Sequence, residues 1–263
     1  MVEFSEILQI ISSYWEIVLL FFVVAILYAS VGFGGGSSYL AILALTSLAF
    51  TQIRTTALIC NIIVVSGGSI MYAKNNLYEW KKVVPLVLFS VPLAFVGGYL
   101  KISETFFFIL LGCTLLNAAF FMWISKFISE TPTNKNFKPS IKRDASYGGI
   151  IGFISGMVGI GGGIFLAPLL HLTNWDTPKR IAATSSFFIL VNSIAGLIGQ
   201  LQSTNKTIEI NWTIILVLGC TVFIGGQIGS RLSNYSISAI TLKRATAILV
   251  AFVGVRILWK HLF

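Results

Sequence analysis

Two glycine-rich stretches, set in apolar sequence, carry the residues best suited to bind a ligand. They are Val31-Gly32-Phe33-Gly34-Gly35-Gly36 and Val158-Gly159-Ile160-Gly161-Gly162-Gly163. Because glycine costs roughly 1 kcal/mol more than alanine in a helix interior, each run should interrupt a helix. The backbone N–H groups freed where the helix resumes form the kind of site that attracts anions. The first chemistry that the sequence predicts is therefore anion binding by backbone groups.

The side chains that perform most enzymatic and metal chemistry do not gather in this sequence. His171 and His261 lie far apart near predicted helix ends, and no carboxylate shares an apolar run with either. The cysteines are single residues in apolar runs, without the spacing of a metal or redox site: Cys60, Cys113 and Cys220. We therefore predict no catalytic residue, no metal site, no cofactor and no enzymatic activity.

Composition places the chain in a membrane. Of its 263 residues, 56% are hydrophobic and only 10% are charged, whereas soluble domains carry about 25% charged residues. The net charge of +9 comes from 18 basic residues. They are scattered over short loops and form no single basic face, which argues against nucleic acid as a partner. The sequence thus predicts a polytopic, all-α membrane protein in a lipid bilayer.

The apolar runs predict ten helices in two sets of five. The first set occupies residues 1–128, with helices over 15–31, 37–50, 55–73, 83–100 and 105–128. The second set occupies residues 145–263, with helices over 146–158, 164–173, 181–201, 212–231 and 240–259. Residues 129–144 hold prolines, asparagines and several lysines, and they predict a polar linker between the two sets.

The two sets are related by an internal duplication. A shift of 127 residues aligns Val31, Gly32, Gly34, Gly35, Gly36, Leu43, Leu45 and Thr46 with Val158, Gly159, Gly161, Gly162, Gly163, Leu170, Leu172 and Thr173. After a gap of one residue, Thr51, Arg54 and Ala57 align with Thr177, Arg180 and Ala183. The duplication makes Gly36 equivalent to Gly163, and Arg54 equivalent to Arg180.

The basic residues favour one topology. If each glycine-broken helix pair returns to its own side of the membrane, 13 of the 18 basic residues share a side, whereas a single crossing divides them 11 to 7. Cytoplasmic loops are enriched in lysine and arginine, so the returning arrangement is favoured; the length of each pair is compatible with either arrangement. A returning pair plus three spans makes an odd number of crossings. We therefore predict inverted repeats, with both termini periplasmic and the 129–144 linker cytoplasmic.

Five segments resemble the sulfite exporter TauE/SafE family of membrane permeases: GFGGG, GMVGIGGGIFLAPLL, QIRTTAL, PKRIAATSS and GGQIGSRL. The resemblance extends over nearly the whole chain. It implies transport of a small anion, often a sulfur-containing one such as sulfite, sulfoacetate or thiosulfate, across the bacterial inner membrane. It does not fix the substrate, because members of the family differ in what they carry.

We predict that the anion binds near the middle of the membrane, between the two helices that resume after the glycines. The glycine stretches supply these candidates: Gly34, Gly35, Gly36, Ser37, Ser38, Gly161, Gly162 and Gly163. Polar residues within spans add Asn61, Asn192 and Gln227, because such side chains are costly in lipid without a partner. The alternative for these three is hydrogen bonding between helices. Ile164 and Phe165 stand where the first half has Ser37 and Ser38, so the two half-sites differ chemically.

Three arginines near span ends are candidates for guiding the anion: Arg54, Arg180 and Arg231. Arg54 and Arg180 begin equivalent spans and lie on opposite faces in the inverted arrangement. The alternative is that they are anchors whose charged ends extend to the membrane surface. The nine acidic residues all fall in loops or near span ends, which disfavours a buried cation site.

Two functions are compatible with these features. One is a secondary carrier for a small anion, and the other is a membrane-embedded enzyme or helper subunit that uses the same polar interior. An enzyme should show a nucleophile with its base, or a metal cluster, within the spans. The sequence shows neither, so the carrier is favoured. The sequence leaves open the anion, the direction, the coupling ion and the oligomeric state, a homo-oligomer included.

Overall fold

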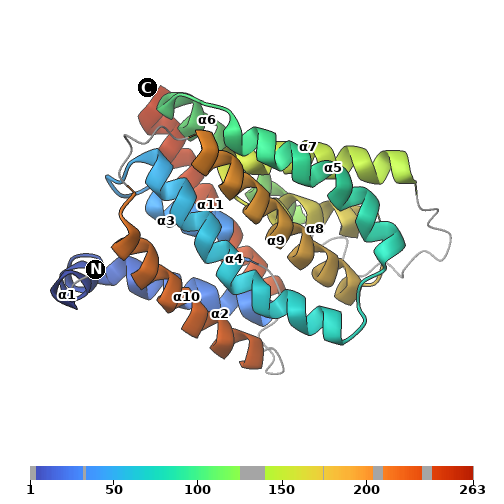
Figure 1. The fold of residues 1–263 in the computed structure, drawn as a ribbon, viewed down its shortest axis with the longest axis horizontal. Coiled ribbons are helices and arrows are strands. Elements are labelled where there is room, and N and C mark those ends of the chain that lie inside the picture. Colours follow the sequence, from blue (N-terminus) through green and yellow to red (C-terminus); the bar gives the residue numbers. More distant parts are fainter. Residues whose placement is uncertain are drawn as a thin grey trace.

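The computed structural model describes residues 4–31, 34–124, 140–173, 175–203, 210–232 and 239–262, and all regular structure within these ranges is helical (Figure 1). The helices are α1 (Phe4–Ser13), α2 (Trp15–Val31), α3 (Gly36–Leu43), α4 (Phe50–Lys74), α5 (Trp80–Tyr99), α6 (Glu104–Ile124), α7 (Ile141–Val158), α8 (Gly163–Leu172), α9 (Pro178–Ser203), α10 (Trp212–Leu232) and α11 (Ala239–Leu262). The all-α fold predicted from the apolar runs is confirmed.

Five of these helices are long and apolar enough to cross a membrane: α4, α5, α6, α9 and α10. Each contains an apolar window of 18 residues, which is about 27 Å of helix and close to the roughly 30 Å hydrocarbon core of a bilayer. By contrast, α8 has 10 residues and is about 15 Å long. A helix of that length cannot cross a bilayer alone.

The helix bounds differ from the predicted ones chiefly around the loops. The sequence predicts a short helix over 37–50, but α3 ends at Leu43, where Thr46 donates its hydroxyl to Leu43 O (2.6 Å). The next helix, α4, begins at Phe50, earlier than the predicted start at residue 55. No helix is predicted before Trp15, yet α1 forms there and contacts α2 and α10. Most of the predicted 129–144 linker lies outside the described residues, and its last residues begin α7.

Glycines set the contact between α5 and α7. A Cβ atom at Gly148, Gly152 or Gly156 of α7 would overlap the backbone of α5, and the backbone atoms it would meet belong to Leu86, Ser90 and Ala94, respectively. Small residues spaced by four allow this close approach between helix backbones. Along this contact the residue numbers of α5 and of α7 increase in the same direction, so the two helices are parallel. Gly225 and Gly229 of α10 lie against Phe22 and Ile26 of α2 in the same way.

The long helices α4 and α9 pack against each other in opposite directions. Gln200 Nε2 donates to Thr51 O (2.9 Å) at one end of the pair. Asn61 Nδ2 donates to Ser193 Oγ (3.0 Å) further along. At the other end Ser69 Oγ lies 3.0 Å from Ser186 Oγ. Residue numbers rise along α4 as they fall along α9, so these two helices, which the predicted duplication makes equivalent, are antiparallel.

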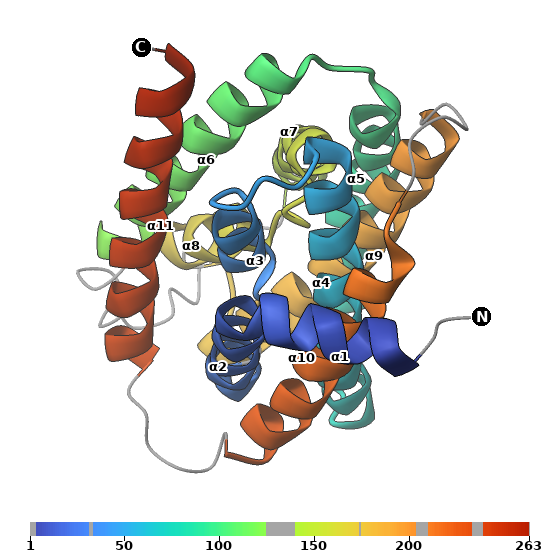
Figure 2. The ribbon, with the colours of Figure 1, turned by 90° about the vertical axis from the view of Figure 1, so that its left-hand side faces the viewer.

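The helix contacts are symmetric when the two predicted halves are exchanged. The pair α5 and α7 has its counterpart in α10 and α2, and the pair α5 and α9 has its counterpart in α10 and α4. The short helices α3 and α8 pack on α4 and α9, respectively, while α6 packs on α11. Figure 2 shows α3 and α8 inside the ring of longer helices. This arrangement brings the two glycine-rich breaks into the interior.

Candidate functional site

Both glycine-rich breaks reach the same side chain, Asn61 of α4, which is fully buried. Asn61 Nδ2 donates to Ile160 O (3.2 Å) in the second break as well as to Ser193 Oγ on α9. From the first break, a Cβ added at Gly36 would lie 2.6 Å from Ile160 O and 3.0 Å from Asn61 Nδ2. The two breaks therefore contact each other as well as Asn61. We call this meeting point of Gly34, Gly36, Asn61, Ile160 and Gly161 the glycine junction.

The second break requires glycine because of its backbone conformation. Gly159, Gly161 and Gly162 have φ angles of 87°, 80° and 83°, which side chains with a Cβ rarely adopt. Gly159 ends α7 in the left-handed conformation, and its N–H donates to Ser155 O (2.7 Å). Gly162, also left-handed, precedes the first residue of α8. Four residues, 159–162, thus separate the end of α7 from the start of α8.

The described part of the first break uses glycine for a different reason. Gly35, which precedes α3, has an ordinary φ of −91°. A Cβ at Gly34 would instead overlap Asn61, and one at Gly35 would lie 2.6 Å from the ring of Tyr39. Here glycine is needed because other groups approach closely. The described part of the first break is therefore similar in sequence to the second break but not in conformation.

Several buried polar atoms around the breaks have no hydrogen-bond partner in the protein. They are Asn61 Oδ1, Asn192 Oδ1, Thr184 Oγ1, Ser185 Oγ, Tyr39 Oη and Arg54 Nε. Leaving such a group unpaired costs about 1–3 kcal/mol, so native proteins usually complete it with water or a ligand. These atoms are therefore available to a polar ligand that enters the interior.

Arg54 is a buried charge. Its side chain is 97% buried, Nη2 donates to Gly156 O (3.1 Å), and the guanidinium carbon lies 5.9 Å from the centre of the Phe107 ring. None of the ion pairs among the described residues includes Arg54. Arg54 also contacts the C-terminal end of α7, where the helix dipole favours a cation. In this structure its charged end stays inside the bundle and does not extend to the surface.

The equivalent arginine has different surroundings. Arg180 Nη1 lies 2.9 Å from Glu79 Oε2 and 3.8 Å from Asp176 Oδ2, and its side chain is partly exposed. Arg231, the third candidate, is exposed at the end of α10. Among the described residues of the two breaks, Gly159 lies next to Arg54.

The remaining sequence candidates divide between the interior and the surface. Ser37 and Ser38 are buried on α3, and Ser38 Oγ lies 2.9 Å from Tyr28 Oη. Asn192 is buried too, but its amide donates to Phe188 O (2.8 Å) in its own helix. Gln227 is exposed on α10 and is not part of the glycine junction. Added Cβ atoms at Gly162 and Gly163 would meet side chains of α7 and α9.

Sequence reasoning missed a charged network at the end of the bundle where α5 and α7 begin. Lys82 Nζ pairs with Asp176 Oδ2 (2.6 Å) and lies 5.3 Å from the centre of the Trp175 ring. Trp175 Nε1 donates to Asp144 Oδ2 (3.4 Å), and Arg143 pairs with the same carboxylate (3.2 Å). The network holds α5, α7 and the segment before α9 together. Its acidic members look like ordinary loop residues in the sequence, and only the fold shows that Asp144 is buried.

Tyr78, in the loop between α4 and α5, extends the polar contacts at this end. Its hydroxyl donates to Ser69 O (3.0 Å). Burial raises the pKa of Tyr78 to about 12, so the phenol is neutral at physiological pH. At the other end Gln52 exchanges two hydrogen bonds with the backbone of Asn211 (2.9 and 3.1 Å), both between neutral groups.

Within the described part of the chain, no group of three or more His, Cys, Asp or Glu side chains could hold a metal ion. The buried carboxylate there, Asp144, is paired with Arg143. The interior around the glycine junction offers amide, hydroxyl and guanidinium groups. Such a set can bind and release a polar ligand through hydrogen bonds.

The fold and the junction define a polytopic helical membrane protein with interrupted helices in its interior. The chain belongs to the sulfite exporter TauE/SafE family, whose model matches residues 17–257, and it is a membrane transporter. It is 33% identical to the probable membrane transporter protein y4hK of Sinorhizobium fredii, over 91% of this chain and 96% of that protein.

More distant relatives bear similar names. The probable membrane transporter protein YunE of Bacillus subtilis is 28% identical over 43% of this chain and 40% of its own length. The probable membrane transporter protein MJ0441 of Methanocaldococcus jannaschii is 26% identical over 62% of each chain. No solved structure gives a significant match.

Proposed function

We propose that this transporter carries a small anion, which it binds at the glycine junction. The observation that carries the proposal is the meeting of both glycine breaks at the buried Asn61. The helices α3 and α8 begin at these breaks, and the N-terminal end of a helix attracts negative charge. Hydrogen bonds from backbone N–H groups at these helix ends can replace part of an anion's hydration and still allow its release.

The charges of the interior support an anionic substrate. Arg54 lies seven residues before Asn61 on the same helix, which is a distance of about 10 Å along the axis. It is buried and has no carboxylate partner among the described residues. A buried guanidinium without a counter-ion is favourable for an anion that passes nearby. The unpaired hydroxyl groups of Thr184 and Ser185 add donors on α9.

The transport mechanism that we propose is alternating access between two inverted repeats, with both termini in the periplasm. The antiparallel packing of α4 against α9 supports the inversion, because equivalent helices of inverted halves cross the membrane in opposite directions. In the present conformation the two breaks contact each other. A ligand can therefore enter the junction only when they separate, and rocking of the halves would provide this movement.

We further propose that the substrate is a sulfur oxyanion, sulfite first of all, and that the protein works in the bacterial inner membrane. The family description supports this choice. Sulfite is small and carries its charge on oxygen atoms that accept hydrogen bonds. These properties suit a site built from N–H, O–H and guanidinium donors.

Flux measurements in proteoliposomes test the proposal. The purified chain should transport radiolabelled sulfite, thiosulfate or a sulfonate down an imposed gradient, and liposomes without protein should not. An Asn61→Ala variant that inserts normally should lose most of this flux, because both breaks contact Asn61. Transport of none of these anions, or full flux through the variant, would contradict the proposal.

A further inference from the structure

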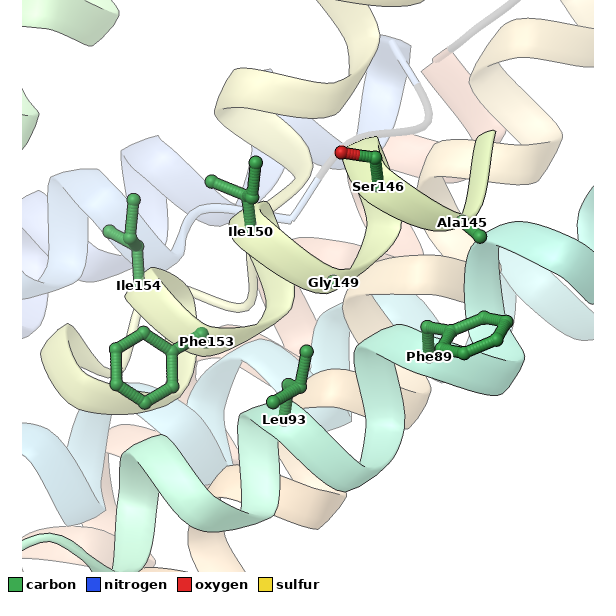
Figure 3. Close-up of a pocket in the computed structure, with 8 residues that line it drawn as sticks. All are labelled: Phe89, Leu93, Ala145, Ser146, Gly149, Ile150, Phe153 and Ile154. Atoms are coloured by element: carbon green, nitrogen blue, oxygen red, sulfur yellow. The ribbon is translucent and has the colours of Figure 1, made fainter. Parts of the chain in front are cut away.

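The outer surface of the bundle carries a groove between α5 and α7 (Figure 3). Its volume is about 670 Å³, and Phe89, Leu93, Gly149, Ile150 and Phe153 are among the residues that line it. Figure 3 shows that side chains of the two helices flank Gly149, which has none. Phe89 is 49% exposed and Ile150 is 60% exposed. The groove is therefore apolar and open to the surroundings of the protein, away from the glycine junction.

A row of residues continues the groove to the start of α7. Lys142 stands four residues before Ser146 and seven before Gly149, so these residues share one face of the helix. Ser146 lines the end of the groove. Because α5 and α7 are parallel, Lys81 near the start of α5 lies at the same end. Both lysines are exposed, and no ion pair among the described residues includes either of them.

We propose that the groove is a binding site for an anionic phospholipid. One acyl chain lies along Gly149 and Ile150, and the phosphate lies near Lys81 and Lys142. An apolar groove with two lysines at the same end of its helices, neither of them in an ion pair among the described residues, complements a lipid in both parts. Basic pockets beside membrane-spanning helices bind anionic head groups in this way. The acyl chain of a zwitterionic lipid can fill the groove, but its head group brings no net negative charge to the lysines.

A second copy of the chain is a less favourable occupant. A symmetric dimer uses the same surface on both subunits, so placing the groove at its twofold axis would bring the Lys81 and Lys142 side chains of both copies close together. Like charges at such a contact oppose association. The lipid instead neutralises these charges.

Native mass spectrometry of the full chain in detergent tests the site. The protein is titrated with dioleoylphosphatidylglycerol or with dioleoylphosphatidylcholine, and the bound fraction is measured. We expect one tightly retained phosphatidylglycerol molecule and weaker retention of phosphatidylcholine. Each of the changes Lys81→Gln and Lys142→Gln should weaken phosphatidylglycerol binding about five-fold. Lys179→Gln, which removes an exposed lysine at the start of α9, is the matched control and should have no effect.

A second variant separates the groove from the charges. Ser146 is exposed, so Ser146→Phe should fold normally while its ring fills the end of the groove. It should reduce retention of both lipids, with an unchanged unfolding temperature. If both lipids are retained equally and the lysine changes have no effect, the groove holds ordinary bilayer lipid. This result would overturn the proposal. So would a dimer mass that Ser146→Phe abolishes, because a second copy would then occupy the groove.

Discussion

At the scale of single residues, the contrast between Arg54 and Arg180 is the most informative feature. The duplication makes them equivalent, yet Arg54 is buried without a carboxylate partner among the described residues, whereas Arg180 pairs with Glu79. A partly exposed ion pair of this kind contributes little to stability. The two arginines therefore have different capacities to interact with an anion, although their sequence contexts are similar.

We expect Arg54→Ala to weaken the apparent substrate affinity by about 10- to 100-fold, the range for losing a charge-assisted hydrogen bond. Arg54→Lys should restore part of the affinity, since it keeps the charge but loses the planar donor geometry. Arg180→Ala should have a smaller effect, because Glu79 already neutralises this side chain. The measurement is the concentration dependence of anion uptake into proteoliposomes, with insertion checked for each variant. Unchanged kinetics in Arg54→Ala would show that this arginine caps the C-terminal end of α7 and does not interact with the anion.

At the scale of helices, the two breaks reach one meeting point by different local structures. The second break contains three glycines with positive φ, whereas the described part of the first break packs ordinary backbone against Asn61 and Ile160. The duplication in the sequence predicts that Gly36 and Gly163 behave alike. The structure gives them different neighbours. An added Cβ at Gly36 would meet backbone, while one at Gly163 would meet the end of the Ile189 side chain, which can rotate.

We therefore expect Gly36→Ala to abolish most transport and Gly163→Ala to retain a large part of it. Gly68→Ala is the matched control within α4, because its Cβ would have an ordinary contact of 3.6 Å with Ser186 Oγ. The initial rate of anion uptake per inserted molecule decides the outcome. Equal losses of uptake in Gly36→Ala and Gly163→Ala would mean that the symmetry of the repeat governs both positions. Full uptake in Gly36→Ala would show that transport does not require close contact between the breaks.

At the scale of the whole molecule, the bundle is held differently at its two ends. Ion pairs around Asp144 and Asp176 join α5, α7 and the segment before α9. At the opposite end, hydrogen bonds between neutral groups join α4, α9 and the start of α10. Basic residues gather at the charged end, as the rule for cytoplasmic loops requires. The charged end is thus the one that we expect in the cytoplasm.

The topology follows from this assignment. Reporter fusions at the N-terminus and the C-terminus should give periplasmic signals, and a fusion within 129–144 should give a cytoplasmic signal. An odd number of crossings in each half produces this pattern. A fusion at residue 76, between α4 and α5, provides an internal reference that should also report the cytoplasm. A cytoplasmic C-terminus would exclude the inverted arrangement.

The sequence by itself determined the class of protein and most of its helices, because hydrophobic length and glycine interruption act locally along the chain. It could not determine which polar residues share a site. Asn61 and Gln227 are both polar residues within apolar runs, but the packing of α4 against α9 buries Asn61, while α10 leaves Gln227 exposed. The partners of Arg180 likewise come from distant segments. Burial and pairing depend on contacts between remote elements, and only the tertiary structure decided them.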